Sequence, residues 1–166
     1  LKKSTKKINN FIKKNKPIII SLNFIKDLKI KGNIDYLGIC HPSRIISEIK
    51  TIPSHVKLIT PFSSFNKELK NLTKHFNKID YGLKVEEKKF NYYENYCILE
   101  KILVLPYILS FLFSSNVKTI FFAGLDGYEN NKINRKENNK ILRKFKSLNK
   151  NIIKFLTPTL YKIWGF

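Results

Sequence analysis

The sequence has few of the residues that identify disulfide-rich and metal-binding proteins. It contains two cysteines, Cys40 and Cys97, which do not form a CxxC spacing. Two isolated cysteines exclude a disulfide framework and favour a reducing compartment, so we expect a cytoplasmic protein. The three histidines, His41, His55 and His75, complete no zinc-ligand spacing with these cysteines.

Methionine is absent from the 166 residues, and the chain begins with Leu1. A translated protein normally begins with Met, so we expect this sequence to be part of a longer protein. Long apolar runs are also absent, since the longest, 98–113, is interrupted by two charges and by Pro106. Such a run is too short and too polar to span a membrane, and it predicts a buried helix instead.

Acidic residues are scarce: 12 stand against 32 basic ones, giving a formal net charge of +20. A charge of this size attracts polyanions and phosphate-bearing ligands. Arginine is best suited to phosphate and base recognition, but it occurs only as Arg44, Arg135 and Arg143, and the lysines are spread along the chain. We therefore interpret the charge as compositional drift toward Lys, Asn and Ile, and do not expect a nucleic-acid partner.

Two further possibilities concern RNA and metal ions. Four aromatic residues within 90–97 could stack on bases, which keeps a basic RNA-binding domain as a minor alternative. The acids are too few and too scattered for a dedicated metal cage, so no metal ligand is predicted. A phosphate-bound Mg²⁺ would need only one or two of them. The four aromatic residues are Phe90, Tyr92, Tyr93 and Tyr96.

Apolar runs and amphipathic segments alternate along the chain. Short, continuous apolar runs predict strands buried on both faces, as in parallel sheets, and apolar residues at helical spacing predict helices between them. With a hydrophobic fraction of 43%, this alternation predicts a single α/β domain over residues 1–166 with a mostly parallel sheet. Strands are predicted over 17–23, 34–42, 56–61, 79–85, 117–126 and 151–158, a strand or loop over 90–96, and helices over 4–17, 43–52, 65–76, 98–115 and 136–148.

Three segments carry more specific predictions. Ser43 is expected to cap the helix that follows it, with Ile46 among the residues that face inward. Pro106 is expected to kink the long buried helix, because it removes one backbone hydrogen bond. The Asn- and Lys-rich segment 128–139 is predicted to be a mobile loop that acts as a lid.

Polar side chains follow the predicted strands at the points where they end. In open parallel sheets, ligands bind at these carboxyl ends. Asp126 could accept hydrogen bonds from ribose or sugar hydroxyls, Tyr128 could bind a phosphate or stack on a base, and His41 could act as a general base. Asn, Ser, Asp and Gly are also ordinary turn and cap residues, and the His41-Pro42 turn could equally be structural. The predicted ligand-binding residues are Asn23, His41, Ser43, Asp126, Tyr128 and Thr159.

Three stretches of the sequence carry a resemblance to known proteins. "KPIIISLN" (16–23), "AGLDGY" (123–128) and "IIKFLTPTLYKI" (152–163) resemble the Rossmann-like C-terminal domain of aldolase-type, HMG-CoA-lyase-like proteins of surface-polysaccharide synthesis. They are also similar to bacterial lipooligosaccharide sialyltransferases and to 6-hydroxymethylpterin pyrophosphokinase-like proteins. The resemblance implies a three-layer Rossmann-like sandwich whose first strand, with a glycine-rich G-x-G-P-S turn, would precede Leu1.

The resemblance also implies a function. It implies binding of a nucleotide or nucleotide-sugar, such as a cytidine nucleotide, in bacterial surface-glycan synthesis. Asn23 would contact the nucleotide, and His41 and Ser43 would lie near the nucleoside, in a turn where the family has Asn-Pro-Ser. Asp126 and Tyr128 would lie beside the nucleotide.

Two features of the sialyltransferases are missing from this sequence. No Thr-Ser-Gly occurs between Asn91 and Ile108, and no histidine follows His75, where those enzymes place a general base. Enzymatic activity is therefore left open. The chain could be a sialyltransferase-like transferase, part of an aldolase-type lyase with an upstream aldolase module, or a non-catalytic scaffold that docks a partner. Thr159 matches the Pro-containing turn after the family's last strand.

Overall fold

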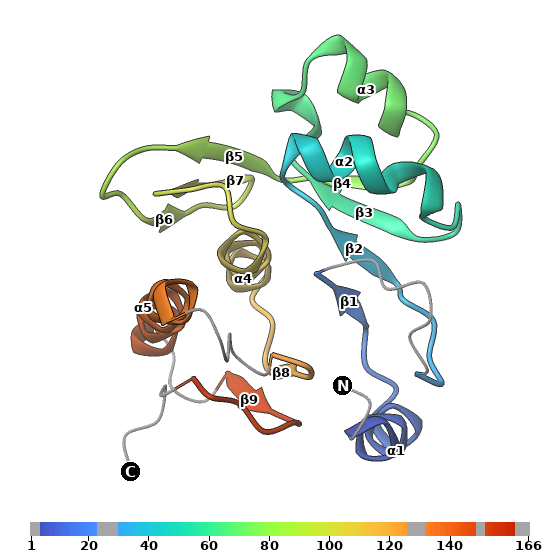
Figure 1. Ribbon diagram of the computed structural model, residues 1–166, viewed down its shortest axis with the longest axis vertical. Helices are drawn as coiled ribbons and strands as arrows, with labels where there is room; N and C mark the ends of the chain where they lie inside the picture. The colour runs from blue at the N-terminus through green and yellow to red at the C-terminus, as the bar shows by residue number, and fades with distance from the viewer. Residues whose placement is uncertain (1–3, 23–29, 126–131, 149–151, 162–166) are drawn as a thin grey trace. The chain divides into compact units, whose positions relative to one another are not determined.

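The structure is a computed structural model that describes residues 4–22, 30–125, 132–148 and 152–161. The chain divides into two compact units. Helices alternate with mostly parallel strands, which confirms the predicted α/β class (Figure 1). The central unit comprises Pro17–Leu28 and Gly32–Asn116, and the terminal unit comprises Leu1–Lys16, Lys29–Lys31 and Val117–Phe166.

Four short parallel strands form the main sheet of the central unit. Their order in the sheet, β1-β2-β3-β4, follows their order in the chain. The register places Leu37 beside Leu58 and Ile59 beside Ile79. Because neighbouring side chains on a strand point to opposite faces, these apolar runs bury residues on both sides of the sheet. The strands are β1 (Ile20–Ser21), β2 (Tyr36–Gly38), β3 (Lys57–Thr60) and β4 (Lys78–Asp80).

Helices cover both faces of this sheet. On one face, α2 and α3 pack in an apolar cluster with Leu37 and Leu58. On the other face, α4 packs in a second cluster with Ile59. Leu58 and Ile59 are neighbours in β3, so one strand supplies both clusters. The helical elements are α2 (Pro42–Glu48), the 3-10 turn η2 (Ile49–Thr51), the 3-10 turn η3 (Phe62–Ser64), α3 (Lys67–Thr73) and α4 (Val104–Ser114).

A second sheet of the central unit has the order β5-β7-β6. The sequence predicts one strand over 79–85, but the chain divides this segment at Tyr81 into β4 and β5 of different sheets. The Tyr81 ring is buried, and its main-chain carbonyl accepts the Tyr107 hydroxyl of α4 (2.5 Å). This contact holds Tyr81 between the two sheets. The strands are β5 (Gly82–Val85), β6 (Asn91–Tyr92) and β7 (Tyr96–Leu99).

The long buried helix is shorter than predicted. The sequence predicts a helix over 98–115, but Ile98 and Leu99 belong to β7 and the helix begins at Val104. A continuous apolar run fits a buried strand as well as a buried helix, so periodicity alone does not separate them. Pro106 therefore lies in the first turn of α4, where its missing N–H would have no helical partner. Pro106 therefore removes no hydrogen bond from α4, and the predicted kink has no cause.

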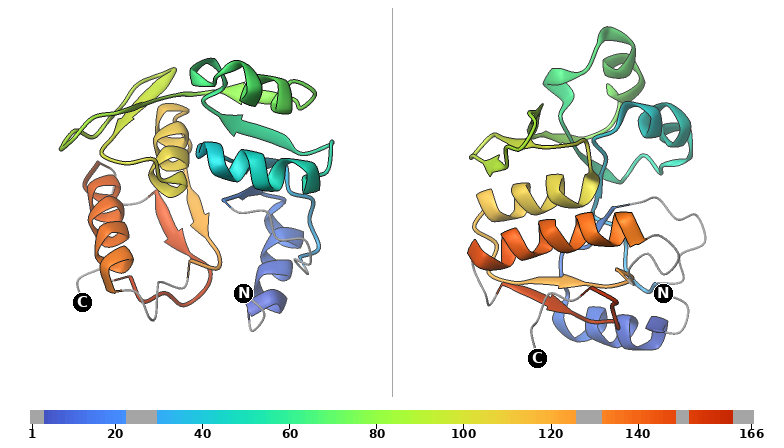
Figure 2. Two further views of the ribbon diagram at one scale, coloured as in Figure 1. Left: turned by 45° about the horizontal axis from the view of Figure 1, so that its top comes forward. Right: turned by 60° about the vertical axis from the view of Figure 1, so that its left-hand side comes forward.

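The terminal unit contains two parallel strands and two helices. Figures 1 and 2 show the strand pair β8 and β9 between α1 and α5. On one face, Phe11 of α1 packs against Phe121 of β8, with the ring centroids 4.6 Å apart. Phe122 and Phe155 pair in register with their rings 5.6 Å apart. The elements are α1 (Thr5–Asn15), β8 (Ile120–Phe122), α5 (Lys132–Leu148) and β9 (Ile153–Phe155).

The helix α5 begins earlier than predicted. The sequence predicts a loop over 128–139, but residues 132–139 are already helical, and 128–131 lie outside the described residues. Asn favours turns, which is why the composition suggests a loop. The helix is held by its apolar side, where Leu142 and Phe145 are completely buried.

Candidate functional site

The carboxyl ends of β2, β3 and β4 place polar side chains along one edge of the main sheet. β2 is followed by two buried residues, Ile39 and Cys40, and then by His41. The Ile39 N–H donates to the Ile59 carbonyl (3.0 Å), so β2 and β3 remain in contact up to this point. Pro42 then begins α2, at a helical position that proline favours. The sheet thus brings His41 to its carboxyl edge at the start of a helix.

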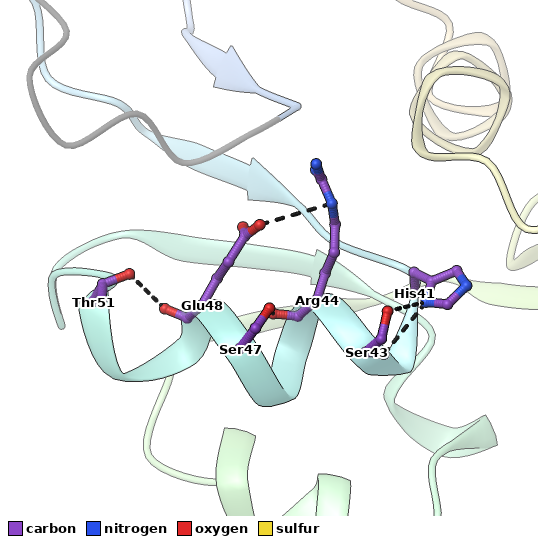
Figure 3. A network of polar contacts seen from close by, with 6 residues as sticks. All are labelled: His41, Ser43, Arg44, Ser47, Glu48 and Thr51. Atoms are coloured by element: carbon purple, nitrogen blue, oxygen red, sulfur yellow. Dashed lines mark hydrogen bonds and ion pairs between the residues drawn. The ribbon is translucent and has the colours of Figure 1, made fainter. Parts of the chain in front are cut away.

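His41 and Ser43 form a hydrogen-bonded pair at this edge (Figure 3). His41 is the N-cap of α2: its Nδ1 accepts the Ser43 backbone N–H (3.3 Å) and lies 2.8 Å from the Ser43 Oγ. Because a backbone N–H can only donate, Nδ1 carries no proton and the neutral ring has its proton on Nε2. The Ser43 hydroxyl therefore donates to Nδ1. Both side chains are exposed.

This pair is better arranged for binding than for catalysis. A serine hydroxyl within reach of a histidine nitrogen is the contact that nucleophilic catalysis requires. The Ser43 hydroxyl makes this contact with Nδ1, so His41 could act as a base toward Ser43 itself, but Nδ1 is not open to accept a proton from a ligand. The pair instead offers a ligand one N–H donor, at His41 Nε2, and one acceptor, the Ser43 hydroxyl oxygen.

The start of α2 differs from the prediction in two ways. The N-cap is His41 and not Ser43, because Pro42 already occupies the first helical position. Ile46 is 56% exposed, whereas it was expected to face inward. It lies about 100° around the helix from the buried Ile45. The other contacts in Figure 3 join Arg44 to Glu48, Ser47 to the Arg44 carbonyl and Thr51 to the Glu48 carbonyl.

β3 and β4 add a second polar group to the same edge. Thr60 and Asp80 end these strands as register partners, so their side chains point to the same face of the sheet. Both Asp80 carboxylate oxygens accept the Ser63 backbone N–H (3.1 Å each), and the carboxylate also accepts the Ser63 hydroxyl. This contact ties η3 to the end of β4. The buried Thr60 hydroxyl has no hydrogen-bond partner among the residues that the structure describes.

Sequence reasoning missed Asp80 as a residue of this edge. The prediction treats 79–85 as one strand, and Asp80 would then lie inside it. The signal was available, because an acid rarely lies inside a buried strand and Gly82 follows two residues later. Together these two residues indicate a strand end.

Thr159 lies in the terminal unit, where its hydroxyl binds the main chain. Its Oγ1 donates to the Leu125 carbonyl (2.7 Å). The Thr157 Oγ1 accepts the Gly124 N–H (3.0 Å). These two threonines fix the segment after β8 to the segment after β9, just before the predicted site residue Asp126. Thr159 therefore has a structural role here, which the sequence did not distinguish from ligand binding.

Three predicted site residues, Asn23, Asp126 and Tyr128, lie outside the described residues. Asn23 belongs to the central unit, as do His41 and Ser43, whereas Asp126 and Tyr128 belong to the terminal unit. Of the predicted ligand-binding residues that the structure describes, it brings His41 and Ser43 together.

The two cysteines are buried and free, in the apolar cluster beneath α4. Burial raises the pKa of Cys40 and of Cys97 to about 12 each, so neither thiol ionises appreciably at neutral pH. Across the described part of the chain, no three side chains of His, Cys, Asp or Glu are grouped in a way that could hold a metal ion. In that same part, no helix combines the length and apolar character needed to cross a membrane.

Comparisons of the chain with protein-family models, curated proteins and solved structures found no match. The resemblance noted from the sequence therefore stays a hypothesis.

Proposed function

We propose that the central unit binds a nucleotide or nucleotide-sugar at the carboxyl edge of its main sheet, over the His41–Ser43 pair. The observation that supports this is the fixed orientation of the pair. Ser43 donates hydrogen bonds to His41 Nδ1, so the ring keeps its proton on Nε2. The His41 Nε2–H donor and the Ser43 oxygen acceptor therefore lie close together at the end of a parallel strand. Nucleobases and ribose carry both hydrogen-bond donors and acceptors, so a nucleoside can match both groups.

The order of the strands supports this position. In doubly wound sheets the ligand lies near the point where the strand order reverses. The order from β1 to β4 runs in one direction, and after β4 the chain leaves for the second sheet. The strand order could therefore reverse only on the other side of β1. β1 lies next to β2, which leads to His41. We propose a Rossmann-like three-layer arrangement in which the ligand lies at the carboxyl ends of β1 and β2.

The biological setting is part of the same proposal. The sequence resemblance favours a cytidine nucleotide or its sugar conjugate, used in bacterial surface-glycan synthesis. A net charge of +20 favours phosphate-bearing ligands in general. Since Nδ1 is engaged, the geometry favours a binding role for His41 over a base in sugar transfer.

Titration calorimetry with CMP and with a CMP-sugar tests the proposal. We expect His41→Gln to weaken CMP binding about 3- to 10-fold, because a neutral hydrogen bond contributes about 0.5–1.5 kcal/mol. Ser43→Ala should cause a similar loss, because it removes the acceptor oxygen and one of the two hydrogen bonds that hold the His41 ring. Because both groups contact the ligand in this proposal, the double variant should bind more weakly than either single variant.

His55→Gln is the matched control. His55 is exposed and precedes β3, at the opposite, amino edge of the sheet. It should leave binding unchanged. Failure of the unsubstituted protein to bind CMP, UMP or AMP, or an equal loss in the His55 variant, would refute the proposal. Release of CMP from the CMP-sugar would show a transferase or hydrolase instead of a binding domain.

A further inference from the structure

The second sheet of the central unit presents two tyrosines on the face that points away from α4. The helix α4 packs on one face of this sheet, where Cys97 and Leu99 of β7 share an apolar cluster with Ile108 (Figures 1 and 2). Because side chains alternate along a strand, Tyr96 points to the opposite, outer face. Tyr93 stacks on it there, and the two residues are 42% and 41% exposed.

The turn that carries the two tyrosines is fixed by hydrogen bonds on both sides. The ring centroids lie 4.5 Å apart with 15° between the planes, and the Tyr93 N–H donates to the Tyr96 carbonyl (2.8 Å). The Tyr93 carbonyl accepts the Tyr81 hydroxyl (3.1 Å), and the Asn95 carbonyl accepts the Gly82 N–H (2.8 Å). A Cβ at Gly82 would lie 2.8 Å from the Tyr96 Cβ, so the glycine allows this close approach. The aromatic pair is therefore held in place before any ligand binds.

Polar side chains flank the tyrosine pair on the same face. Asn91 of β6 lies opposite Ile98 of β7, two residues after Tyr96, so Asn91 and Tyr96 share the outer face. The Asn91 side chain is exposed, and so is Glu94 in the turn between the tyrosines. An asparagine amide offers both a donor and an acceptor to a ligand. We call Tyr93, Tyr96 and Asn91 the tyrosine platform.

The segment that carries the platform is electrically neutral, in a chain whose net charge is +20. Residues 81–99 contain three lysines and three glutamates. Glu86 forms ion pairs with Lys84 (2.8 Å) and Lys89 (2.5 Å). A nucleic-acid strand binds through cations that neutralise its phosphates, and these two lysines are already paired with an acid. The local charge therefore favours an uncharged ligand.

The size of the platform indicates a small ligand. Two tyrosines at this exposure offer on the order of 200 Å², whereas a specific protein interface buries about 800 Å² on each partner. An area of this size matches one or two sugar rings. The face of an aromatic ring is negative, and it attracts the weakly positive C–H groups on the apolar face of a sugar.

We infer that the tyrosine platform binds a neutral oligosaccharide. A sugar ring stacks on the exposed part of the tyrosine pair, and the Asn91 amide exchanges hydrogen bonds with its hydroxyls. The platform lies on the second sheet, whereas His41 and Ser43 lie at the edge of the main sheet. This inference therefore does not depend on the nucleotide site proposed above.

NMR titration of the full chain with two neutral sugars, cellotetraose and lacto-N-tetraose, tests the inference. We expect at least one of them to bind with a Kd of about 1 mM and to shift the ring signals of Tyr93 and Tyr96. Replacing both tyrosines by Leu should weaken binding about 10-fold or more, because the aromatic faces are lost. Replacing both by Phe should change the Kd by less than about 3-fold, because phenylalanine keeps the aromatic face.

Two further variants separate binding from folding. Asn91→Ala leaves the tyrosines in place and should weaken binding about 3- to 10-fold, because hydrogen bonds to the sugar are lost. Ile46→Ala is the control: Ile46 is an exposed apolar residue on α2, in the same unit. It should leave sugar binding unchanged. An equal loss in the Ile46 variant and in the tyrosine-to-leucine variant would refute the inference, and so would the absence of binding by both sugars.

Three other results would assign the platform to a different ligand and overturn the inference. An excess of CMP that displaces the sugar would place the sugar at the edge of the main sheet. Oligothymidylate that shifts the signals of Tyr93 and Tyr96, when neither sugar does, would identify a nucleic-acid strand. A dimer in sedimentation equilibrium that the leucine substitutions dissociate would identify a second copy of the chain. A lack of CMP binding, by contrast, would count against the nucleotide proposal alone.

Discussion

At the scale of single residues, the buried hydroxyl of Thr60 is expected to reduce the stability of the protein. The side chain is 0% exposed, and its Oγ1 has no hydrogen-bond partner among the described residues. Burying a hydroxyl without a partner costs about 1–3 kcal/mol. We therefore expect Thr60→Val, which replaces the hydroxyl by a methyl group of similar size, to stabilise the protein by about 1 kcal/mol in urea unfolding.

Thr73 provides the control for Thr60. It is equally buried, but its Oγ1 donates to the Leu69 carbonyl (2.8 Å). Thr73→Val should lower the unfolding free energy by about 1 kcal/mol, because a hydrogen bond is lost. If both valine variants were destabilised alike, the Thr60 hydroxyl would have a partner, and the prediction would fail.

Residue-scale reasoning from the sequence found part of the candidate site. It identified His41 and Ser43 because polar residues that follow an apolar run must lie at a strand end. It assigned the helix cap to Ser43, although Pro42 favours the first helical position and so indicates His41 as the cap. It missed the link between Asp80 and Ser63 because these residues are 17 positions apart and meet through sheet pairing.

At the scale of elements, the contact between β2 and α4 depends on Gly38. A Cβ at this position would lie 2.4 Å from Ile108 Cγ1 and 2.5 Å from its Cδ1. Isoleucine in a helix has little freedom at χ1, so the helix or the strand would have to move. We expect Gly38→Ala to lower the unfolding free energy by about 1–3 kcal/mol, measured by urea denaturation.

The double variant with Ile108→Ala separates this clash from other effects of the glycine. Ile108→Ala alone should cost about 2–5 kcal/mol, because it leaves a cavity. In that background Gly38→Ala should cost nothing or add slight stability, since the clashing atoms are gone. An identical cost of Gly38→Ala in both backgrounds would show that the contact with Ile108 is not the cause.

Every segment that was predicted as a strand from its apolar run contains a strand in the structure. Several of the predicted boundaries, however, are wrong. The runs 34–42 and 56–61 each contain a strand, β2 and β3, because burial on both faces requires continuous apolar residues there. The run beginning at Ile98 was predicted as helix although it supplies the end of β7. Pairing of β7 with β5 and β6 decides this case, and pairing is a long-range property that local pattern does not contain.

At the scale of the whole molecule, two electrostatic effects oppose each other as the pH rises. A charge of +20 destabilises the compact state by self-repulsion, and this repulsion relaxes as lysines lose protons near pH 10. The buried thiols lower the stability of the folded state at high pH, because burial raises the pKa of Cys40 and Cys97 to about 12. An unfolded thiol releases its proton near pH 9.0, so above that pH the unfolded state is favoured.

The variant with both cysteines replaced by Ala isolates the thiol effect. Below about pH 8 the thiols are almost fully protonated in both states, so the unfolding free energy should not depend on their ionisation. Between pH 8 and pH 10 each thiol should lower the unfolding free energy by about 1.4 kcal/mol. Over this interval the unsubstituted protein should therefore lose about 3 kcal/mol relative to the variant, as measured by urea unfolding with a reductant present.

Comparing the two pH profiles removes the contribution of the lysines, because both proteins carry the same ones. It also removes the tyrosines Tyr81 and Tyr107, whose pKa values burial raises in both proteins. The variant will have a lower absolute stability because its smaller side chains leave space in the core, so the change with pH is the quantity to compare. Parallel profiles would mean that Cys40 and Cys97 ionise as easily in the folded protein as in the unfolded chain, and the core beneath α4 would then be open to water.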